Sequence, residues 1–149
     1  MKKPDKEQRL RALMKLYHGS VYEARVRGRR VSLRAGRRCP ALVALQKACG
    51  ARTALYITAW NPRGLSRPRA ANQAANRRLK AELLRLTSHV WGGRGHSEDD
   101  SWSEDSFLAL GISLEDSRKL GRKYRQVAMV WVGRTGIPRI VKTAPLLQG

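Results

Sequence analysis

Apolar residues recur along this chain with two spacings, one typical of helices and one typical of strands. Between Leu10 and Tyr17 they return every three or four positions, and lysines and arginines occupy the rest of the helical surface. This pattern predicts an amphipathic, basic N-terminal helix. Pro40 and Gly50 delimit a further helix, because proline favours a helix start and glycine favours the position just past a helix end. The predicted helices cover residues 4–17, 40–49, 67–87 and 114–125.

Short segments in which apolar and polar residues alternate predict strands. Two pairs of these segments form hairpins, the first turning at Gly28 and the second across residues 134–137. Segment 52–60 is apolar on both faces over much of its length, which indicates a central strand. Residues 89–105 are expected to form a loop with a short strand at its start. The predicted strands outside that loop are 20–26, 30–34, 52–60, 106–112, 126–133 and 138–143.

The order of these elements is ββαβαββαββ after the N-terminal helix. It predicts an α+β fold in a single domain, with a mixed, mostly antiparallel sheet covered by two to four helices. We expect an N-terminal helical segment over residues 1–18, one α+β domain over 19–143 and a C-terminal tail over 144–149. With 149 residues and an apolar share of 42%, the chain can bury about two thirds of its unfolded surface.

The composition is strongly basic. Lysine and arginine number 31 against 11 acidic residues, which gives a formal net charge of +20. A preference of the source organism for arginine would explain why 22 of the basic residues are arginine and 9 are lysine, but it would not explain the shortage of acids. Self-repulsion of this size favours a polyanionic partner. Nucleic acid is the first candidate and an anionic membrane surface is the second.

Two groups of arginines form the candidate nucleic-acid-binding surface. One group lies on the first hairpin and the segment after it, with no acidic residue between positions 25 and 38. The other follows one face of the helix after Ser113 and resembles an electrostatic footprint, and a solvated helix face remains the alternative interpretation. The candidates are Arg25, Arg27, Arg29, Arg30, Arg34, Arg37, Arg38, Arg118, Arg122 and Arg125.

RNA is weakly preferred over DNA as the partner, on charge and arginine content alone. The nine aromatic residues are too few for a stacking platform of the RRM type. An acidic protein is the third candidate partner. No apolar stretch approaches the length of a membrane span, and the basic start lacks the apolar segment of a targeting signal. We therefore expect no membrane partner and a cytoplasmic protein.

A sharp turn over Asn61–Arg69 follows the central strand. Pro62 cannot continue the hydrogen-bonded ladder, and Gly64 permits a positive φ. Arginines in the turn lie beside the start of the next helix, where backbone N–H groups and cationic side chains favour a phosphate or a carboxylate. Two asparagines on that helix, Asn72 and Asn76, either line this site or hydrogen-bond the incoming loop and hold its shape.

The acidic residues are as unevenly placed as the basic ones. Five of them lie close together at Glu98, Asp99, Asp100, Glu104 and Asp105. Carboxylates this close repel one another unless a cation lies among them. The loop therefore shields a basic groove, holds a metal ion or supplies a catalytic carboxylate, and the sequence leaves these alternatives open. Its spacing does not fit an EF-hand.

No metal site is assigned and no cofactor is predicted. The two cysteines lie at opposite ends of the predicted helix 40–49, about 15 Å apart along its axis, which is too far for a disulfide. We expect free thiols at Cys39 and Cys49. No metal-binding cysteine or histidine spacing is present.

Four elements taken together resemble a bacterial family, domain of unknown function 3293. They are LYITAWNPRG at residues 55–64, Asn72 with Asn76, WSEDS at residues 102–106 and YRQVAMV at residues 124–130. The resemblance extends over roughly residues 20 to 141. It implies the fold and the positions of the motifs, and it implies no activity.

The polar residues of these motifs and of the turn define a candidate ligand pocket. Amide, carboxylate and indole groups can stack on a base and hydrogen-bond its edge, or they can form a buried network that fixes the connections of the sheet. Glu104 is the single candidate general acid or base. The pocket candidates are Trp60, Asn61, Arg63, Asn72, Asn76, Trp102 and Gln126.

The leading hypothesis is a small basic protein that binds RNA or DNA through phosphate contacts. The alternative is an enzyme or small-ligand-binding protein whose polar pocket is formed by the Asn61–Arg69 turn and Glu104. No Ser-His-Asp, Cys-His or histidine–metal arrangement accompanies these residues, so the sequence does not identify a hydrolase active site.

Overall fold

The computed structural model of the chain describes residues 2–3 and 5–143. Its elements follow the predicted order, and the tail expected over 144–149 lies outside the described residues. The helices are α1 (Lys6–Gly19), α2 (Pro40–Cys49), α3 (Arg69–Leu86) and α4 (Leu114–Lys123), with a short 3-10 turn η1 (Pro62–Gly64). The strands are β1 (Val21–Val26), β2 (Arg29–Leu33), β3 (Ala54–Ile57), β4 (Val90–His96), β5 (Ser103–Leu110), β6 (Ala128–Val132) and β7 (Arg139–Lys142).

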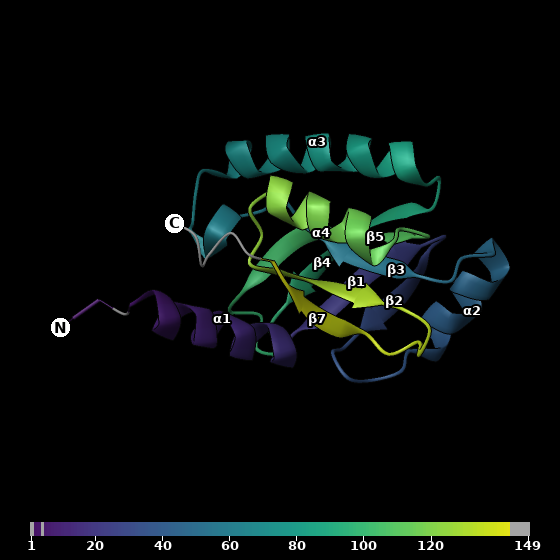
Figure 1. Cartoon of the computed structure of the whole chain (residues 1–149), viewed down its shortest axis with the longest axis horizontal. Coiled ribbons are helices and arrows are strands. Elements are labelled where there is room, and N and C mark those ends of the chain that lie inside the picture. The colour runs from purple at the N-terminus through teal and green to yellow at the C-terminus, as the bar shows by residue number, and fades with distance from the viewer. Residues whose placement is uncertain (1, 4, 144–149) are drawn as a thin grey trace.

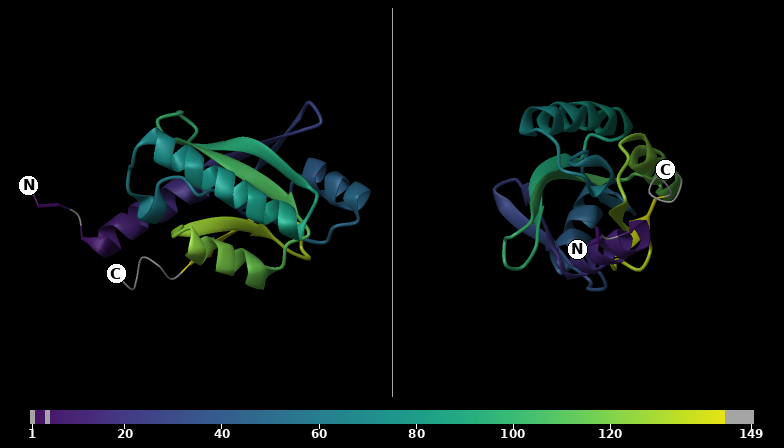
Figure 2. Two further views of the ribbon diagram at one scale, coloured as in Figure 1. Left: turned by 90° about the horizontal axis from the view of Figure 1, so that it is seen from above. Right: turned by 90° about the vertical axis from the view of Figure 1, so that its left-hand side faces the viewer.

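The seven strands form one curled sheet in the order β2-β1-β4-β5-β3-β6-β7. Helices α3 and α4 cover one face, and α1 and α2 lie against the other (Figure 1). The curl of the sheet around α1 and α2 is visible along the axis of the molecule (Figure 2). The α+β class is confirmed. The sheet is wholly antiparallel among the described strands, where the sequence allowed a mixed one.

The internal strand β3 is buried on both faces. It pairs with β5 on one side and β6 on the other, and successive side chains point to opposite faces of a sheet. Leu55 therefore packs against Leu79 of α3, while Tyr56 belongs to the layer that contains Leu42 of α2. Each fully buried leucine contributes about 1.5–3 kcal/mol. The predicted apolar internal strand is confirmed, but it covers Ala54–Ile57 and is shorter than the predicted 52–60.

Local turn chemistry also follows the sequence. In the first hairpin Arg27 and Gly28 have φ values of 52° and 80°, as a two-residue turn between right-twisted strands requires. Pro40 occupies the first turn of α2, and Gly50 ends that helix in the left-handed conformation with φ 65°. Both cysteines of this region are free. These predictions are confirmed.

The expected loop over 89–105 contains more strand than the sequence predicted. β4 runs for seven residues, and β5 begins at Ser103, three residues earlier than expected. Three glycines give β4 a low strand propensity, but Gly93 lets the backbone of β1 approach closely. A Cβ atom at Gly93 would lie 1.8 Å from the carbonyl oxygen of Glu23. β4 therefore forms because it pairs with β1 and β5, and local strand propensity does not reveal that pairing.

Helix α4 ends earlier than predicted, and this changes the position of Arg125. Tyr124 caps the helix, and the Gln126 N–H donates to the Gly121 carbonyl at 2.9 Å. Arg125 takes the left-handed position between them, with φ 53°, a place usually given to glycine. The expected stripe of three arginines on one helix face is thus reduced to Arg118 and Arg122.

Candidate functional site

A network of side-chain amides joins the end of β3 to α3. The Asn61 N–H donates to Asn72 Oδ1 at 2.8 Å, and Asn72 Nδ2 donates back to Asn61 Oδ1 at 2.8 Å. One turn further along α3, Asn76 Oδ1 accepts from the Ala59 N–H at 2.8 Å. Arg67 closes the network, because its Nε donates to Asn72 Oδ1 at 2.5 Å and its Nη2 donates to the Ala59 carbonyl at 3.0 Å. The turn is fastened to α3 through side chains.

The asparagines of α3 are buried, with Asn72 1% and Asn76 6% exposed. Their amide groups bond to other parts of the chain, and Asn76 Nδ2 donates to the Asp105 carbonyl at 2.9 Å. A buried amide is costly unless its donors and acceptors are satisfied. This arrangement supports the interpretation that the asparagines hold the incoming loop. Direct contact of these side chains with a ligand stays a prediction.

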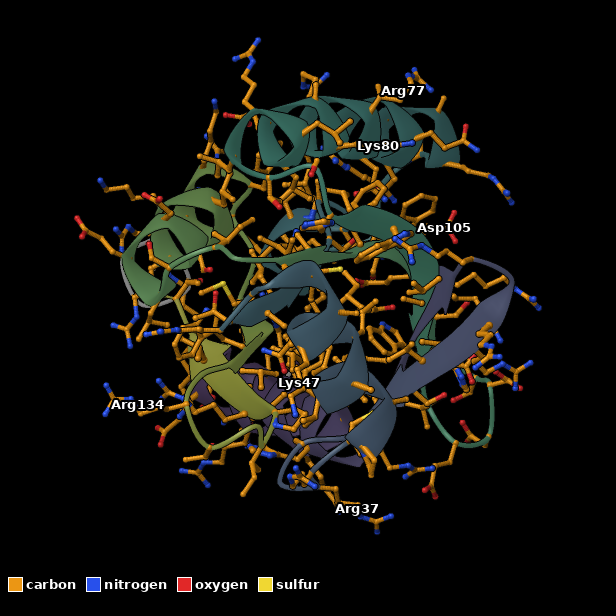
Figure 3. All side chains as sticks on the ribbon, turned by 90° about the vertical axis from the view of Figure 1, so that its right-hand side faces the viewer. Arg37, Lys47, Arg77, Lys80, Asp105 and Arg134 are labelled. Atoms are coloured by element: carbon orange, nitrogen blue, oxygen red, sulfur yellow. The ribbon has the colours of Figure 1, made fainter. Side chains whose placement is uncertain are left out.

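The predicted pocket residues do not come together in one pocket. Trp60 and Asn76 line a groove on the α3–α4 face, beside Arg77 and Lys80 of α3 (Figure 3). Trp102, Glu104 and Gln126 line a cavity on the opposite face of the sheet. A single hydrogen bond, from Gln126 Nε2 to the Trp60 carbonyl at 3.2 Å, connects the two groups.

Asn61 and Arg63 line neither of these pockets. The Arg63 side chain is exposed, and its N–H donates to the Arg125 carbonyl at 2.7 Å. This bond holds η1 against the segment that follows α4. The Asn61–Arg69 turn and Glu104 are therefore separate features of the structure, where the sequence placed them in one candidate pocket.

Glu104 is a buried carboxyl group in a small cavity of about 40 Å³. Three tyrosines and Trp102 form much of the cavity wall. Burial raises the pKa of Glu104 to about 8, although a hydrogen bond from Trp102 offsets part of that increase. The volume is enough for a few water molecules and too small for a nucleobase. A pKa close to neutrality is typical of a group that exchanges a proton at a functional site.

A basic groove of about 510 Å³ lies between α3 and α4, and it was not predicted from the sequence as one site. Five cationic side chains line it, and Glu82 is the acidic residue among them. Arg78 and Arg85 are seven residues apart on α3, which is a readable same-face spacing. The end of α4 faces these two arginines across the groove, and the position of α4 depends on the pairing of distant strands. The cationic side chains are those of Arg67, Arg78, Arg85, Lys123 and Arg125.

The Glu82 carboxylate is already engaged by neighbours in the groove. Lys123 Nζ donates to it at 2.6 Å, and the Tyr124 hydroxyl also donates to it. Burial by itself would raise the pKa of Glu82, but these hydrogen bonds and the positive charges of Lys123 and Arg85 together outweigh burial and lower it. Glu82 therefore stays ionised, and Lys123 is the cation with which it forms an ion pair.

The arginines predicted from sequence are distributed over the surface. Those of the first hairpin lie on β1 and β2, at one edge of the sheet, whereas α4 packs near β6 toward the other edge. Arg34 of the segment after the hairpin pairs with Glu98. Arg38 lines a further groove with two cations of other segments. These are Lys47 and Arg134 (Figure 3). The two predicted groups do not form one continuous cluster.

The acidic loop pairs with the protein's own arginines. A Glu98 oxygen lies 2.6 Å from Arg34, and an Asp100 oxygen lies 3.1 Å from Arg94. Within residues 2–3 and 5–143, no three His, Cys, Asp or Glu side chains gather in an arrangement that could hold a metal ion. Of the alternatives left open by the sequence, shielding of basic side chains has direct support in these pairs.

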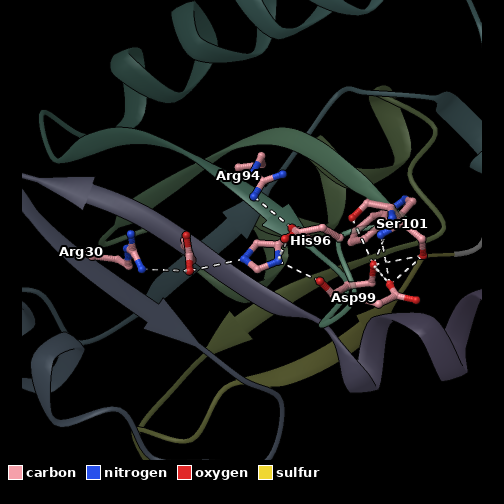
Figure 4. A network of polar contacts seen from close by, with 9 residues as sticks. Arg30, Arg94, His96, Asp99 and Ser101 are labelled. Atoms are coloured by element: carbon pink, nitrogen blue, oxygen red, sulfur yellow. Dashed lines mark hydrogen bonds and ion pairs between the residues drawn. The ribbon is translucent and has the colours of Figure 1, made fainter.

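His96 lies between two carboxylates beside this loop (Figure 4). Its Nδ1 is 3.2 Å from Asp100 and its Nε2 is 3.3 Å from Glu23. The second contact lacks hydrogen-bond geometry, so Nε2 is a buried polar atom without a hydrogen bond in the described part of the chain.

Hydrogen bonds, above all from Ser101, lower the pKa of Asp99 to about 2. The loop is organised by its own side chains.

Comparison with known proteins agrees with the family resemblance. Residues 57–129 match the family model described as Protein of unknown function (DUF3293). The chain resembles this family. The matched segment includes the end of β3, the asparagines of α3, Glu104 and Gln126, and it is shorter than the resemblance read from the motifs. No curated protein and no solved structure showed significant similarity to the chain. The DUF3293 description assigns no activity, so the surface and the cavities of the protein are the evidence for its function.

A membrane-crossing helix is absent from the described residues, since no helix there combines the necessary length with the necessary hydrophobicity.

Proposed function

We propose that the protein binds nucleic acid through phosphate contacts in the groove between α3 and α4. One observation carries this proposal: five cationic side chains line a single groove, and its acidic residue is already paired with Lys123. Within the described part of the chain, the four remaining cations form no ion pair. They are Arg67, Arg78, Arg85 and Arg125.

Two of these arginines are close enough to repel each other. Burial lowers the pKa of Arg67, and the positive charge of Arg78 lowers it further. An anion placed between the two guanidinium groups would relieve this repulsion. Phosphate suits the position, because guanidinium groups donate charge-assisted hydrogen bonds to its oxygens. Arg67 would use the N–H groups that its bonds to Asn72 and Ala59 leave free.

The length of the groove favours a polymer over a single anion. Arg78 and Arg85 lie two helical turns apart, about 10 Å along one face of α3. With a volume of about 510 Å³, the groove has room for consecutive phosphates of a strand. The exposed arginines elsewhere, including Arg25–Arg38, add long-range attraction that does not depend on base sequence. RNA stays the first polymer to test, on charge and arginine content alone.

The alternative function, an enzyme or small-ligand-binding protein with one pocket from the Asn61–Arg69 turn and Glu104, has less support. The cavity that contains Glu104 has no residue of that turn in its wall.

The proposal is tested by fluorescence anisotropy with the full chain and labelled RNA, single-stranded DNA and duplex DNA of one sequence. Titrations run from about 50 to 200 mM NaCl, since each phosphate contact contributes a slope of about 0.7–0.9 to the salt dependence. The groove variant is Arg78→Gln/Arg85→Gln. The matched control is Arg118→Gln/Arg122→Gln, which removes two exposed arginines from α4 outside the groove.

We expect the groove variant to bind at least tenfold more weakly at about 50 mM NaCl and to flatten the salt slope by about 1.5. The α4 control should lose no more than about threefold, the effect of net charge alone. Glu82→Gln should bind more tightly than the wild type, because it removes the acid and releases Lys123. Equal losses in the two double variants would show that affinity follows net charge and would overturn the groove. Absence of binding to all three polymers would overturn the function.

A further inference from the structure

The cavity around Glu104 is a second feature, independent of the basic groove. Its aromatic side chains come from separate elements: Tyr17 from α1, Tyr22 from β1, Tyr56 from β3, and Trp102 from the residue before β5. The Tyr17 and Trp102 rings lie 5.9 Å apart, and the Tyr22 and Tyr56 rings lie 5.4 Å apart. The fold thus builds an aromatic enclosure around one carboxyl group.

Most hydrogen-bond donors of the enclosure are already used. Hydroxyl and amide groups in its wall donate to backbone carbonyls, which leaves their lone pairs and the carboxyl group as acceptors. The committed donors belong to Tyr22, Tyr56, Thr58, Ser106 and Gln126. A ligand that satisfies such a wall must itself donate hydrogen bonds.

The carboxyl group has no cationic partner from the protein. Glu104 is 7% exposed, and within residues 2–3 and 5–143 no lysine, arginine or histidine forms an ion pair with it. In a protein of net charge +20, an acid kept apart from every basic side chain is unexpected. A buried carboxylate without a counter-ion is costly, so the position is suited to a cation from outside the chain.

We propose that this cavity binds a small alkylammonium ion, with Glu104 as its counter-ion and the aromatic rings as its walls. An ammonium group supplies N–H donors to the acceptors of the wall in addition to the one from Trp102, and it is attracted to the faces of tyrosine and tryptophan rings. The volume of about 40 Å³ admits a head group of a few heavy atoms and excludes a nucleobase. The ionised form of Glu104 would repel an anion.

Binding of such a cation is coupled to a proton. Burial raises the pKa of Glu104 to about 8, so at pH 7 the empty cavity holds mostly the neutral acid. The cation selects the carboxylate, and the proton of Glu104 leaves to solvent. Tyr17, Tyr22 and Tyr56 face the same space, and burial raises the pKa of each further above its ordinary value. The tyrosines stay neutral, and Glu104 is the group in the cavity wall that titrates.

The test is a titration of the full chain with methylammonium chloride at constant ionic strength, followed by the indole N–H resonances in NMR spectra and by calorimetry. The Trp102 resonance is identified with the variant Trp102→Phe. We expect a saturable shift of that resonance, and an affinity that rises about 50-fold between pH 6 and pH 8. Calorimetry at pH 7 in two buffers with different ionisation enthalpies should show release of close to one proton per ion bound. Methanol, which is similar in size and uncharged, should give no saturable shift.

Glu104→Gln should abolish the pH dependence and weaken binding at pH 8 by at least tenfold. Asp105→Asn is the matched control, because Asp105 is the next residue of β5 and its side chain is exposed on the opposite face. It should bind like the wild type. Equal shifts in the wild type and Glu104→Gln, or equal responses to methanol and methylammonium, would overturn the proposal. If Glu104→Gln does not fold, the calorimetric measurement on the wild type tests the proposal instead. Release of close to zero protons per ion bound would overturn it.

Discussion

Asn61 and Asn72 hydrogen-bond each other twice, once through the Asn61 backbone N–H and once through the Asn72 amide, each at 2.8 Å. Asn61 has a φ of 45°, in the left-handed region that asparagine tolerates better than most residues. Asn72 is the more buried partner, at 1% exposure. The pair fixes the point where β3 turns into the segment leading to α3, and it therefore sets the position of Arg67 at the mouth of the basic groove.

Asn72→Ala should destabilise the protein by about 2–4 kcal/mol, because it leaves buried partners on Asn61 and Arg67 without a hydrogen bond. The free energy of unfolding is measured by urea denaturation. Gln73→Ala is the control, since Gln73 is the next residue of α3 and is exposed. Its effect should stay within about 0.5 kcal/mol. Equal effects of the two substitutions would show that the amide network contributes no stability of its own.

Gly93→Ala should be strongly destabilising, and Gly92→Ala should not. A Cβ atom at Gly93 would lie 1.8 Å from the Glu23 carbonyl oxygen, whereas nothing lies within 4 Å of a Cβ atom at Gly92. The first substitution forces β1 and β4 apart and should cost about 2 kcal/mol or more. The second should change the free energy of unfolding by less than about 1 kcal/mol. A tolerated Gly93→Ala would contradict the close approach of β1 and β4.

Glu104 should make the protein less stable as the pH rises. The carboxyl group titrates near 4.5 in the unfolded chain and near 8 in the folded chain, so the folded state binds more protons between these values. Its contribution to stability is fully present below pH 4.5 and is lost as the pH rises through 8.

The measurement is urea denaturation of the wild type and Glu104→Gln at pH 5 and pH 8. The change between the two pH values should be more unfavourable for the wild type than for the variant, by on the order of 3 kcal/mol. Parallel pH profiles of the two proteins would show that Glu104 does not titrate with a raised pKa.

The order of the elements could be read from the sequence because its signals are local. Alternation in β1 and β2, the apolar run of β3, the Arg27-Gly28 turn and the helix boundary at Gly50 each depend on neighbours a few residues away. β4 was predicted as a short strand and is seven residues long. Its glycines lower its strand propensity, although they allow the close approach of β1. The sequence predicted Arg125 on the face of α4 because no glycine follows that helix to mark its end.

The candidate sites were predictable only in part. Glu104 and Trp102 were singled out as members of a pocket, and they do line one cavity. Trp60 and Asn76 line a groove on the other face of the sheet. Asn76 belongs to α3, which covers that face, and Trp60 follows the end of β3. The α3–α4 groove was missed, since no spacing within one helix reveals which helix lies beside it.

The sequence by itself determined the α+β order, the buried central strand, the turn chemistry and the excess of positive charge, all of which arise from composition or from contacts within a few residues. The tertiary structure decided where the charge gathers and which acid is buried. Antiparallel pairing across the whole sheet sets α3 beside α4, and the same pairing turns Glu104 inward and Asp105 outward. Desolvation and repulsion depend on distances between residues far apart in the chain, and only the folded chain fixes those distances.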